Sequence, residues 1–381
     1  MSVRAASSSD MAGLLAQADF GVLIRMLADE GYTVIGPRVE AEAVTYREIQ
    51  HADELPAGWG SRQEGGRYRL ERRRDDALFG YVQGVQSWRP HLFRPSRTLW
   101  RAQRTEEGFE FATPDESAPK LAFLGVRACE IAAIDLQDRV FSQGAAPDPD
   151  YKTRRESLFI VAVQCTEAGD TCFCTSMGTG PAVEWGYDLK LTELIDGDRH
   201  VFLVESGSSK GVALAAGLPL MSADDTDRES ARTRTEQAAG AMGRSMETAG
   251  LKELIQENQE HSRWDAVAER CLACTNCTLV CPTCFCNTTE DVTSLDGQST
   301  ERRQRWDSCF TFDHSYLHGG SVRTTVAARY RQWMSHKLAH WIDQYGESGC
   351  VGCGRCITWC PAAIDITEEA AALREAVEGG V

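Results

Sequence analysis

The residues best suited to chemistry in this sequence are its fifteen cysteines, eleven of which lie after residue 270. Eight of these eleven form two runs with the same pattern, C-x2-C-x2-C-x3-C-P, over residues 271–282 and 350–361. Three thiolates spaced three positions apart can wrap a tight loop around one 4Fe-4S cube, so that each reaches a different iron. The two runs therefore predict two 4Fe-4S clusters.

The fourth cysteine of each run lies just before a proline, as in bacterial ferredoxins, where this cysteine binds the neighbouring cluster. The expected ligands are Cys271, Cys274, Cys277 and Cys360 for one cluster, and Cys350, Cys353, Cys356 and Cys281 for the other. Structural zinc is the alternative, but zinc usually takes two separated C-x2-C pairs. Three cysteines within seven residues, followed by a fourth and a proline, favour iron–sulfur clusters instead.

Four more cysteines lie in the N-terminal half, namely Cys129, Cys165, Cys172 and Cys174. The first two each end an apolar run typical of a buried strand, and the other two lie in a turn rich in glycine. Neighbouring parallel strands end at the same edge of a sheet, so these thiols are expected to meet there. They predict a third 4Fe-4S site, in which Gly169, Gly178 and Gly180 let backbone N–H groups approach the sulfurs. Buried free thiols are the alternative.

The remaining cysteines, Cys284, Cys286 and Cys309, cannot complete an all-cysteine cube because they are only three. One interpretation is that they pack around a cluster. The other is a redox-active thiol group or a further metal site, for which Asp307 and His314 are additional candidate ligands.

The elements that position these cysteines are predicted by the hydrophobic pattern. Residues 121–126 and 158–163 are apolar runs typical of buried strands, and residues 130–141 between them have helical periodicity. Strand, helix and strand in this order predict a βαβ unit. The pattern also predicts a helix over 13–30 and a hairpin over 188–205 with Asp-Gly in its turn.

A further helix is predicted at about residues 322–344. It carries Arg323, Arg329, Arg331 and Lys337, and the histidine pair His336 and His340. We expect a solvated helix face and surface histidines. The alternative is a basic surface that offsets cluster charge or docks an acidic partner.

The length of 381 residues predicts two or three domains at roughly 150 residues each. We expect an α/β N-terminal domain with the βαβ unit over 1–220, a helical linker over 221–265 and an α+β dicluster ferredoxin-like domain over 266–381. Residues 287–349 are expected to be a helical insertion in the last domain.

Composition excludes several classes of function. The formal net charge of −16 disfavours nucleic acid and anionic membranes as partners, because both attract basic proteins. No apolar run approaches the roughly 18 residues of a membrane helix. Residues 1–10 lack the pattern of a secretory signal, so a cytoplasmic location is expected, where thiols stay reduced.

No glycine-rich nucleotide fingerprint follows a strand, and no P-loop is present. The chain thus has electron carriers but no evident catalytic site of its own, which indicates work inside a larger complex. The segments GVRACEIAAIDLQDRVF and VAVQCTEAGDTCFCTSMGTGP, together with the two C-terminal runs, resemble the beta subunit of sulfhydrogenase-type soluble NiFe hydrogenase. An iron–sulfur subunit of anaerobic sulfite reductase is similar. The resemblance covers about residues 75–365.

This resemblance implies an iron–sulfur electron-transfer subunit with clusters in both halves. Its implied partners are the large and small NiFe hydrogenase subunits and a flavin- and NAD(P)-binding subunit. Two alternatives stay open. One is the electron-transfer subunit of an anaerobic sulfite or sulfur reductase. The other is a thiol or polysulfide reductase acting at Cys284, Cys286 and Cys309.

Overall fold

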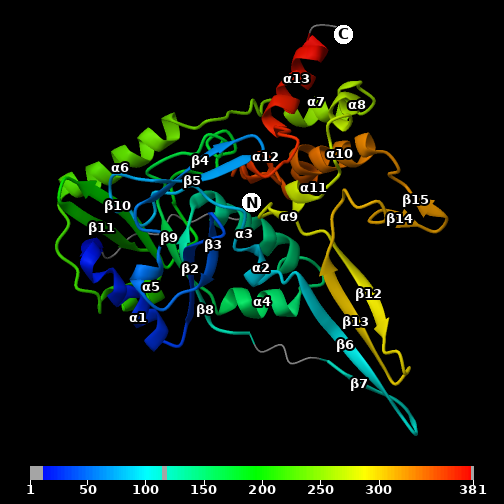
Figure 1. Cartoon of the computed structure of the whole chain (residues 1–381), viewed down its shortest axis with the longest axis horizontal. Helices are drawn as coiled ribbons and strands as arrows, with labels where there is room; N and C mark the ends of the chain where they lie inside the picture. The colour runs from blue at the N-terminus through cyan, green and yellow to red at the C-terminus, as the bar shows by residue number, and fades with distance from the viewer. Residues whose placement is uncertain (1–11, 114–117, 379–381) are drawn as a thin grey trace.

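A seven-stranded mixed sheet forms the centre of the N-terminal half (Figure 1). The computed structural model describes residues 12–113 and 118–378; the interpretation of residues 1–10 lies outside this part of the chain. The strands are, in spatial order, β1 (Ala12–Ala16), β11 (Arg199–Ser206), β10 (Leu189–Asp196), β9 (Phe159–Val163), β8 (Leu121–Val126), β2 (Thr33–Glu40) and β3 (Ala43–Glu48). The four strands β10, β9, β8 and β2 run parallel, and antiparallel strands flank them.

The predicted βαβ unit is confirmed. Strands β8 and β9 pair in parallel, and the connection between them contains two helices, α3 (Ala128–Phe141) and α4 (Pro149–Glu156). Alternate side chains of β9 enter two different cores, with Phe159 and Val161 on one face and Ile160 on the other. Helices α1 (Phe20–Asp29) and α5 (Ser209–Ala215) cover the first face, whereas α3 and α4 cover the second. Burial on both faces explains why these strands are continuously apolar.

The predicted hairpin is also present, since β10 and β11 pair through a turn in which Gly197 has a φ of +59°. The predicted helix over 13–30 is wrong in its first part. Residues Ala12–Ala16 form β1, which pairs with β11 at the sheet edge, and a 3-10 turn (Gln17–Asp19) precedes α1. Tertiary pairing overrides local periodicity here, as short apolar segments often permit.

A four-stranded sheet extends away from the body of the molecule (Figure 1). Its order is β12 (Asn287–Thr293), β13 (Ser299–Trp306), β6 (Ser96–Thr105) and β7 (Gly108–Ala112). The insertion predicted to be helical therefore begins with a β-hairpin, which corrects that expectation. The physical reason is long-range: β13 gains hydrogen bonds by pairing with β6, almost 200 residues earlier. Two small hairpins are β4 (Trp59–Glu64) with β5 (Arg67–Arg72), and β14 (Tyr316–Leu317) with β15 (Gly320–Ser321).

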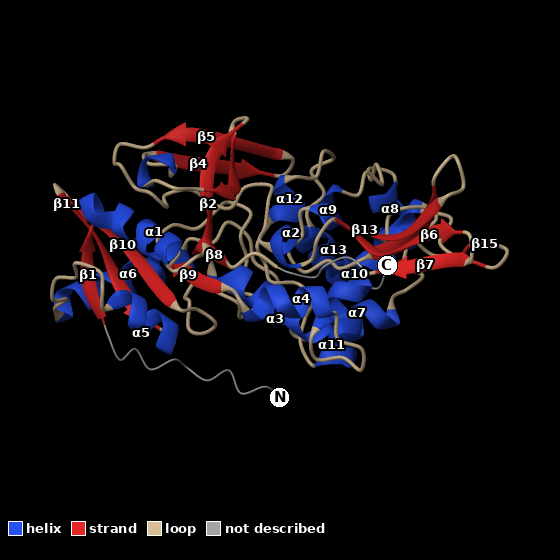
Figure 2. Ribbon diagram, turned by 90° about the horizontal axis from the view of Figure 1, so that it is seen from below, coloured by secondary structure: helices blue, strands red, loops and turns tan. Residues whose placement is uncertain are grey.

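Helices form most of the rest of the C-terminal half, at the other side of the molecule from the large sheet (Figure 2). The exception is α6 (Asp225–Gly240), which packs on β10 and β11 of that sheet. The others are α7 (Leu251–Glu257), α8 (Arg263–Ala268), α9 (Asn276–Leu279), α10 (Val326–Ser335), α11 (Trp341–Tyr345), α12 (Arg355–Thr358) and α13 (Ile366–Glu378). The predicted 322–344 helix is thus α10 and α11 joined by a π-helical turn, His336–His340. Short elements also occur at Ala52–Glu54 and in α2 (Arg89–Leu92).

The two halves meet through backbone contact between two cysteine-bearing loops. Phe173 from the N-terminal half is fully buried in the C-terminal core, and its N–H donates to the Gly352 carbonyl over 2.9 Å. A Cβ on Gly352 would lie 2.6 Å from the Phe173 carbonyl carbon, which is too close for any side chain. Beside this contact, Arg355 and Glu130 form an ion pair of 2.5 Å with both side chains 1% exposed.

We predict that Gly352→Ala destabilises the protein more than Gly346→Ala does. Both glycines have positive φ, +64° and +78°, so both substitutions add about 1–2 kcal/mol of left-handed strain. Only Gly352 faces another backbone, because a Cβ on Gly346 meets nothing within 4 Å. Overpacking should therefore cost Gly352→Ala a further ~1–3 kcal/mol. Thermal unfolding of both variants measures the difference, and equal midpoints would contradict the tight contact.

Candidate metal centres

The two C-terminal cysteine runs fold into loops of the same shape. In the first run Ala273 and Thr275 have positive φ, and in the second Gly352 and Gly354 occupy the matching positions. The N–H groups of Ala273 and Gly352 each donate to the sulfur of the first cysteine of their run over 3.5 Å. A short helix follows in each case, α9 or α12. The repeated pattern in the sequence therefore corresponds to a repeated backbone geometry.

The first site is a pocket lined by the first three cysteines of one run and the last cysteine of the other. These four residues are Cys271, Cys274, Cys277 and Cys360. The Ile364 N–H donates to the Cys360 sulfur over 3.3 Å. Burial raises the pKa of Cys277, and the nearby Cys271 and Cys360 raise it further. The pocket thus brings together the four cysteines expected from the proline-flanked pattern, and Cys356 of the second run also lines it.

The second group has the reciprocal composition, with Cys281 near Cys350, Cys353 and Cys356. Burial raises the pKa of Cys356, followed by its neighbours Cys350, Cys353 and Cys281. Cys281 therefore lies near the second run, and it is also close enough to Cys277 to raise the pKa of that thiol.

A buried lysine contacts the second group. Lys337, on the π-helical turn, is 5% exposed, and its ammonium lies 3.2 Å from the Cys281 sulfur and 3.0 Å from the Thr283 hydroxyl. The expectation of a solvated basic face is wrong for this residue and for Arg329, which is also buried. Of the two histidines expected at the surface, His340 is exposed, whereas His336 is partly buried and accepts a hydrogen bond from the Trp341 indole. Helical periodicity alone did not reveal these contacts, because a π-helical turn shifts the facing residues.

The N-terminal cysteines also share one cavity. Cys129 lies in the first turn of α3, Cys165 follows β9, and Cys172 and Cys174 lie in the loop between β9 and β10. All four line this cavity at the carboxyl ends of the parallel strands, together with Cys353 from the second group. The Gln83 side chain donates to the Cys129 sulfur over 3.3 Å.

Of the three glycines expected beside these sulfurs, two lie there. A Cβ on Gly169 or Gly180 would lie 3.2 Å from a cysteine sulfur, Cys172 or Cys174 respectively. Gly178 has open space around it, and its φ of +65° shows that it serves the turn instead. Gly169 and Gly180 therefore leave room beside two of the sulfurs, and the approach of backbone N–H groups to them stays a prediction.

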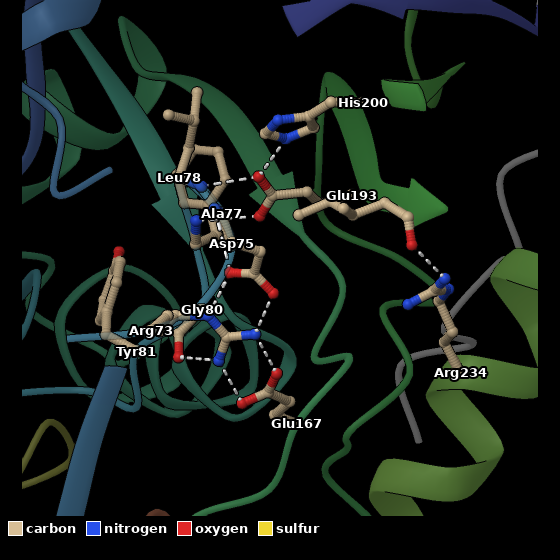
Figure 3. A network of polar contacts seen from close by, with 12 residues as sticks. Arg73, Asp75, Ala77, Leu78, Gly80, Tyr81, Glu167, Glu193, His200 and Arg234 are labelled. Atoms are coloured by element: carbon tan, nitrogen blue, oxygen red, sulfur yellow. Dashed lines mark hydrogen bonds and ion pairs between the residues drawn. The ribbon is translucent and has the colours of Figure 1, made fainter. Parts of the chain in front are cut away.

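Polar contacts fix the segment that covers the N-terminal cavity (Figure 3). Arg73 forms ion pairs with Asp75 and with Glu167, each at 2.7 Å, and Glu167 lines the cavity. The buried Glu193 carboxylate accepts hydrogen bonds from the Leu78 N–H over 2.6 Å and from the Phe79 N–H over 2.9 Å. These contacts hold residues 73–79 in place, and the chain then continues to Gln83 at the cavity wall.

The chemistry of these donor sets fits iron–sulfur clusters. Burial raises the pKa of Cys172 and of Cys350 to about 12, because a thiolate loses hydration inside the protein. A bound metal core overcomes this penalty, since a coordinating thiol is deprotonated outright. Each group offers the four thiols that a 4Fe-4S cluster takes. In the described part of the chain, no three His, Cys, Asp or Glu side chains converge closely enough to hold a single metal ion.

The three spare cysteines lie together on another cavity of about 320 Å³, lined also by His314 and Lys337. Cys286 lies against Cys309, and Cys284 lies against Cys281. The second Thr-Cys-Phe-Cys segment of the sequence thus lies on a cavity that adjoins the second cysteine group through Cys284 and Lys337.

Comparison with known proteins bears on both halves. Residues 270–364 match the family described as 4Fe-4S dicluster domain, and this range contains both cysteine runs. Sulfhydrogenase 2 subunit beta from Pyrococcus furiosus is 32% identical over 312 residues, which cover 81% of this chain and 89% of that protein. No solved structure matches the chain.

The matched dicluster domain indicates 4Fe-4S clusters in the C-terminal half. None of the helices in the described ranges is long and apolar enough to cross a membrane. The similarity to the Pyrococcus furiosus protein extends over most of both chains, beyond the dicluster domain, so it confirms the resemblance drawn from the sequence. The chain belongs to the family of sulfhydrogenase beta subunits.

Proposed function

We propose that this chain is the iron–sulfur electron-transfer subunit of an NAD(P)-linked NiFe hydrogenase complex of the sulfhydrogenase type. Its partners would be the large and small hydrogenase subunits and a flavin- and NAD(P)-binding subunit, in the cytoplasm. Family membership supports the complex, because the relative is named as one subunit of a sulfhydrogenase. The cysteine geometry supports the electron-carrying role.

The proposed ligands form three sets of four cysteines. They are Cys129, Cys165, Cys172 and Cys174; Cys350, Cys353, Cys356 and Cys281; and Cys271, Cys274, Cys277 and Cys360. A 4Fe-4S cluster bound at such a site would accept and release single electrons at a potential set by charge, hydrogen bonding and burial.

The observation that carries this proposal is the position of Cys353. It belongs to the second set and also lines the cavity of the N-terminal set. In turn, Cys277 of the first set lies close enough to Cys356 to raise the pKa of that thiol. Adjacent sets make a continuous row, which suits stepwise electron transfer better than isolated structural sites do.

The ends of this row differ in exposure. Three cysteines of the N-terminal set are buried and Cys165 is partly buried, whereas Cys274 of the first set is exposed and its neighbour Leu272 is 68% exposed. A partner subunit would reach the first set most directly at this loop. Lys337 would tune the middle of the row, because its ammonium stabilises negative charge on the Cys281 sulfur.

Paired variants test whether each run supplies its fourth cysteine to the cluster of the other run. Cys360→Ala should remove the signal of the cluster bound by Cys271, Cys274 and Cys277, and Cys281→Ala should remove the signal of the other C-terminal cluster. Each loses one of four thiolates from its proposed set. Electron paramagnetic resonance and iron quantitation measure the losses. Loss of the second cluster in Cys360→Ala and of the first cluster in Cys281→Ala would contradict this crossed assignment.

The role of the N-terminal set is tested in the intact complex. Cys174→Ser should lower the iron content by about four atoms per chain, the content of one cube. It should slow hydrogen-dependent NAD(P) reduction, while an artificial dye that meets the hydrogenase subunits directly is still reduced. Equal loss of both activities in an assembled complex would mean that this chain does not act as a relay.

Lys337→Met should lower the reduction potential of the second cluster, because it removes a cation 3.2 Å from the Cys281 sulfur. We expect a shift on the order of 60 mV, equivalent to about 1.4 kcal/mol for one electron. Redox titration followed by paramagnetic resonance measures it. The exposed Lys152 supplies the control, since Lys152→Met should leave all potentials unchanged. An unshifted potential in Lys337→Met would contradict the tuning role.

A further inference from the structure

The cavity beside the second cysteine set contains a pair of thiols that no cluster requires. It lies between the loop that follows Cys281 and the helical segment of α10, and its walls include Cys284, Cys286 and Cys309. Phe285, Trp333 and Trp341 supply apolar surface, and Arg323 and Lys337 supply positive charge. Its volume of about 320 Å³ is enough for a small molecule.

The β12–β13 hairpin brings the thiol pair together. Cys286 precedes β12 and Asp307 follows β13, and the Asp307 N–H donates to the Cys286 carbonyl over 2.9 Å. This places Cys309 beside Cys286, where the two side chains are hydrogen-bonded. The two thiols, 23 positions apart in the sequence, thus lie in contact at the end of the hairpin.

A histidine and a carboxylate complete the arrangement. The His314 ring is hydrogen-bonded to the Cys286 sulfur, and its Nδ1 lies 2.7 Å from the Asp307 carboxylate. Asp307 is itself held by the Ser308 N–H over 2.7 Å. A thiol, an imidazole and a carboxylate in this order are the arrangement that activates a cysteine nucleophile.

The charge state of this pair follows from these contacts. Hydrogen bonds from Cys309 and then from His314 hold the pKa of Cys286 well below its usual value. The bond to Cys286, supported by Asp307, raises the pKa of His314 to about 9. The other titratable or charged groups around the cavity are Cys284, Arg323, His336 and Lys337. Burial lowers the pKa of His336 to about 4, so this ring is neutral at pH 7.

We propose that Cys286 and Cys309 form a redox-active dithiol that reduces small anionic disulfides in this cavity, with His314 holding the Cys286 thiolate. Arg323 and Lys337 select for negative charge, and the aromatic walls accept the carbon or sulfur chain. The inference rests on the proposed function only for its electron supply. That supply is close, because Cys284 is hydrogen-bonded to Cys281 of the second cysteine set.

Atoms and electrons balance for a substrate RS–SR. The Cys286 thiolate forms a bond to one sulfur, the substrate S–S bond breaks, and RS⁻ leaves with the proton of the His314 imidazolium. The Cys309 thiol then gives its proton to His314 and forms the Cys286–Cys309 disulfide, and the second RS⁻ leaves with that proton. Two single electrons from the proposed clusters and two solvent protons restore the thiolate, thiol and imidazolium. The net change is RSSR + 2e⁻ + 2H⁺ → 2RSH.

The dithiol is first tested with no electrons beyond those that the reduced chain itself carries. The full chain with its clusters is reduced with dithionite, freed of it, and mixed with 3,3′-dithiodipropionate in an excess that also consumes the electrons stored on the clusters. Peptide mass spectrometry should find a Cys286–Cys309 disulfide in the unaltered chain, a mixed disulfide on Cys286 in Cys309→Ser, and neither in Cys286→Ser. Unchanged substrate reduction by Cys286→Ser would overturn the proposal.

Iron content separates a dithiol from a metal site. Cys286→Ser and Cys309→Ser should keep the iron content of the unaltered chain. Loss of about four irons in either variant would identify these residues as cluster ligands and overturn the proposal. The cationic disulfide cystamine should react at least tenfold more slowly than 3,3′-dithiodipropionate. Equal rates would overturn the selectivity for anions.

The role of His314 has its own readout. The rate at which iodoacetamide alkylates Cys286 should change less than about twofold between pH 6 and 8. The rate for an ordinary thiol with a pKa near 8.5 rises about 75-fold over this range. His314→Gln should make the rise steeper than in the unaltered chain, with Cys309 as the remaining hydrogen-bond partner of the thiolate, and the exposed His318→Gln should not. A steep rise in the unaltered chain would overturn the role of His314.

Turnover with reduced methyl viologen then tests the electron link. Continuous reduction of 3,3′-dithiodipropionate supports both the dithiol and the clusters as its source. A stoichiometric Cys286–Cys309 disulfide without turnover would retain the dithiol and count against the proposed electron-transfer row. The two failures are therefore distinguishable.

Discussion

The contact between the loop at Phe173 and the loop at Gly352 determines much of the rest of the structure. Their backbones approach so closely that a side chain on Gly352 would overlap the backbone at Phe173. Phe173 fills the C-terminal core from the N-terminal half, and the same approach brings Cys353 to the cavity of the N-terminal cysteines. Without this contact the row of cysteine sets would be interrupted between its second and N-terminal members.

Buried charge accompanies this contact and makes its geometry specific. Glu130 accepts from Arg355 and also from the Trp88 indole over 2.9 Å, so its carboxylate is well paired inside the protein. Such a pair is costly to desolvate and strongly destabilising to break, so it favours one docking arrangement of the two halves over displaced ones. Positive charge from Arg355 and Lys337 lies beside cysteine sulfurs, where bound clusters would add negative charge.

Local pattern predicted the parts of the molecule that depend on neighbouring residues. The spacing of the cysteines anticipated which ones the fold groups together, and apolar runs located β8 and β9. The pattern did not reveal that Lys337 is buried, that β13 pairs with β6, or that Ala12–Ala16 forms an edge strand. Each of these depends on partners far away in the sequence, which periodicity cannot report. The domain boundaries stay a prediction.

The matching loops of the two cysteine runs are unlike in one respect that bears on their evolution. Positive φ occurs at Gly352 and Gly354, where an added Cβ would meet the backbone of the N-terminal half, and at Ala273 and Thr275, which carry side chains. If both loops descend from a duplicated ancestor, the loop that now contacts the N-terminal half is restricted to glycine at Gly352 and Gly354, because a Cβ would collide there. The outer copy has accepted larger residues at the same backbone angles. Mutational drift should therefore accumulate on the outer loop, where a partner's surface can co-evolve with it.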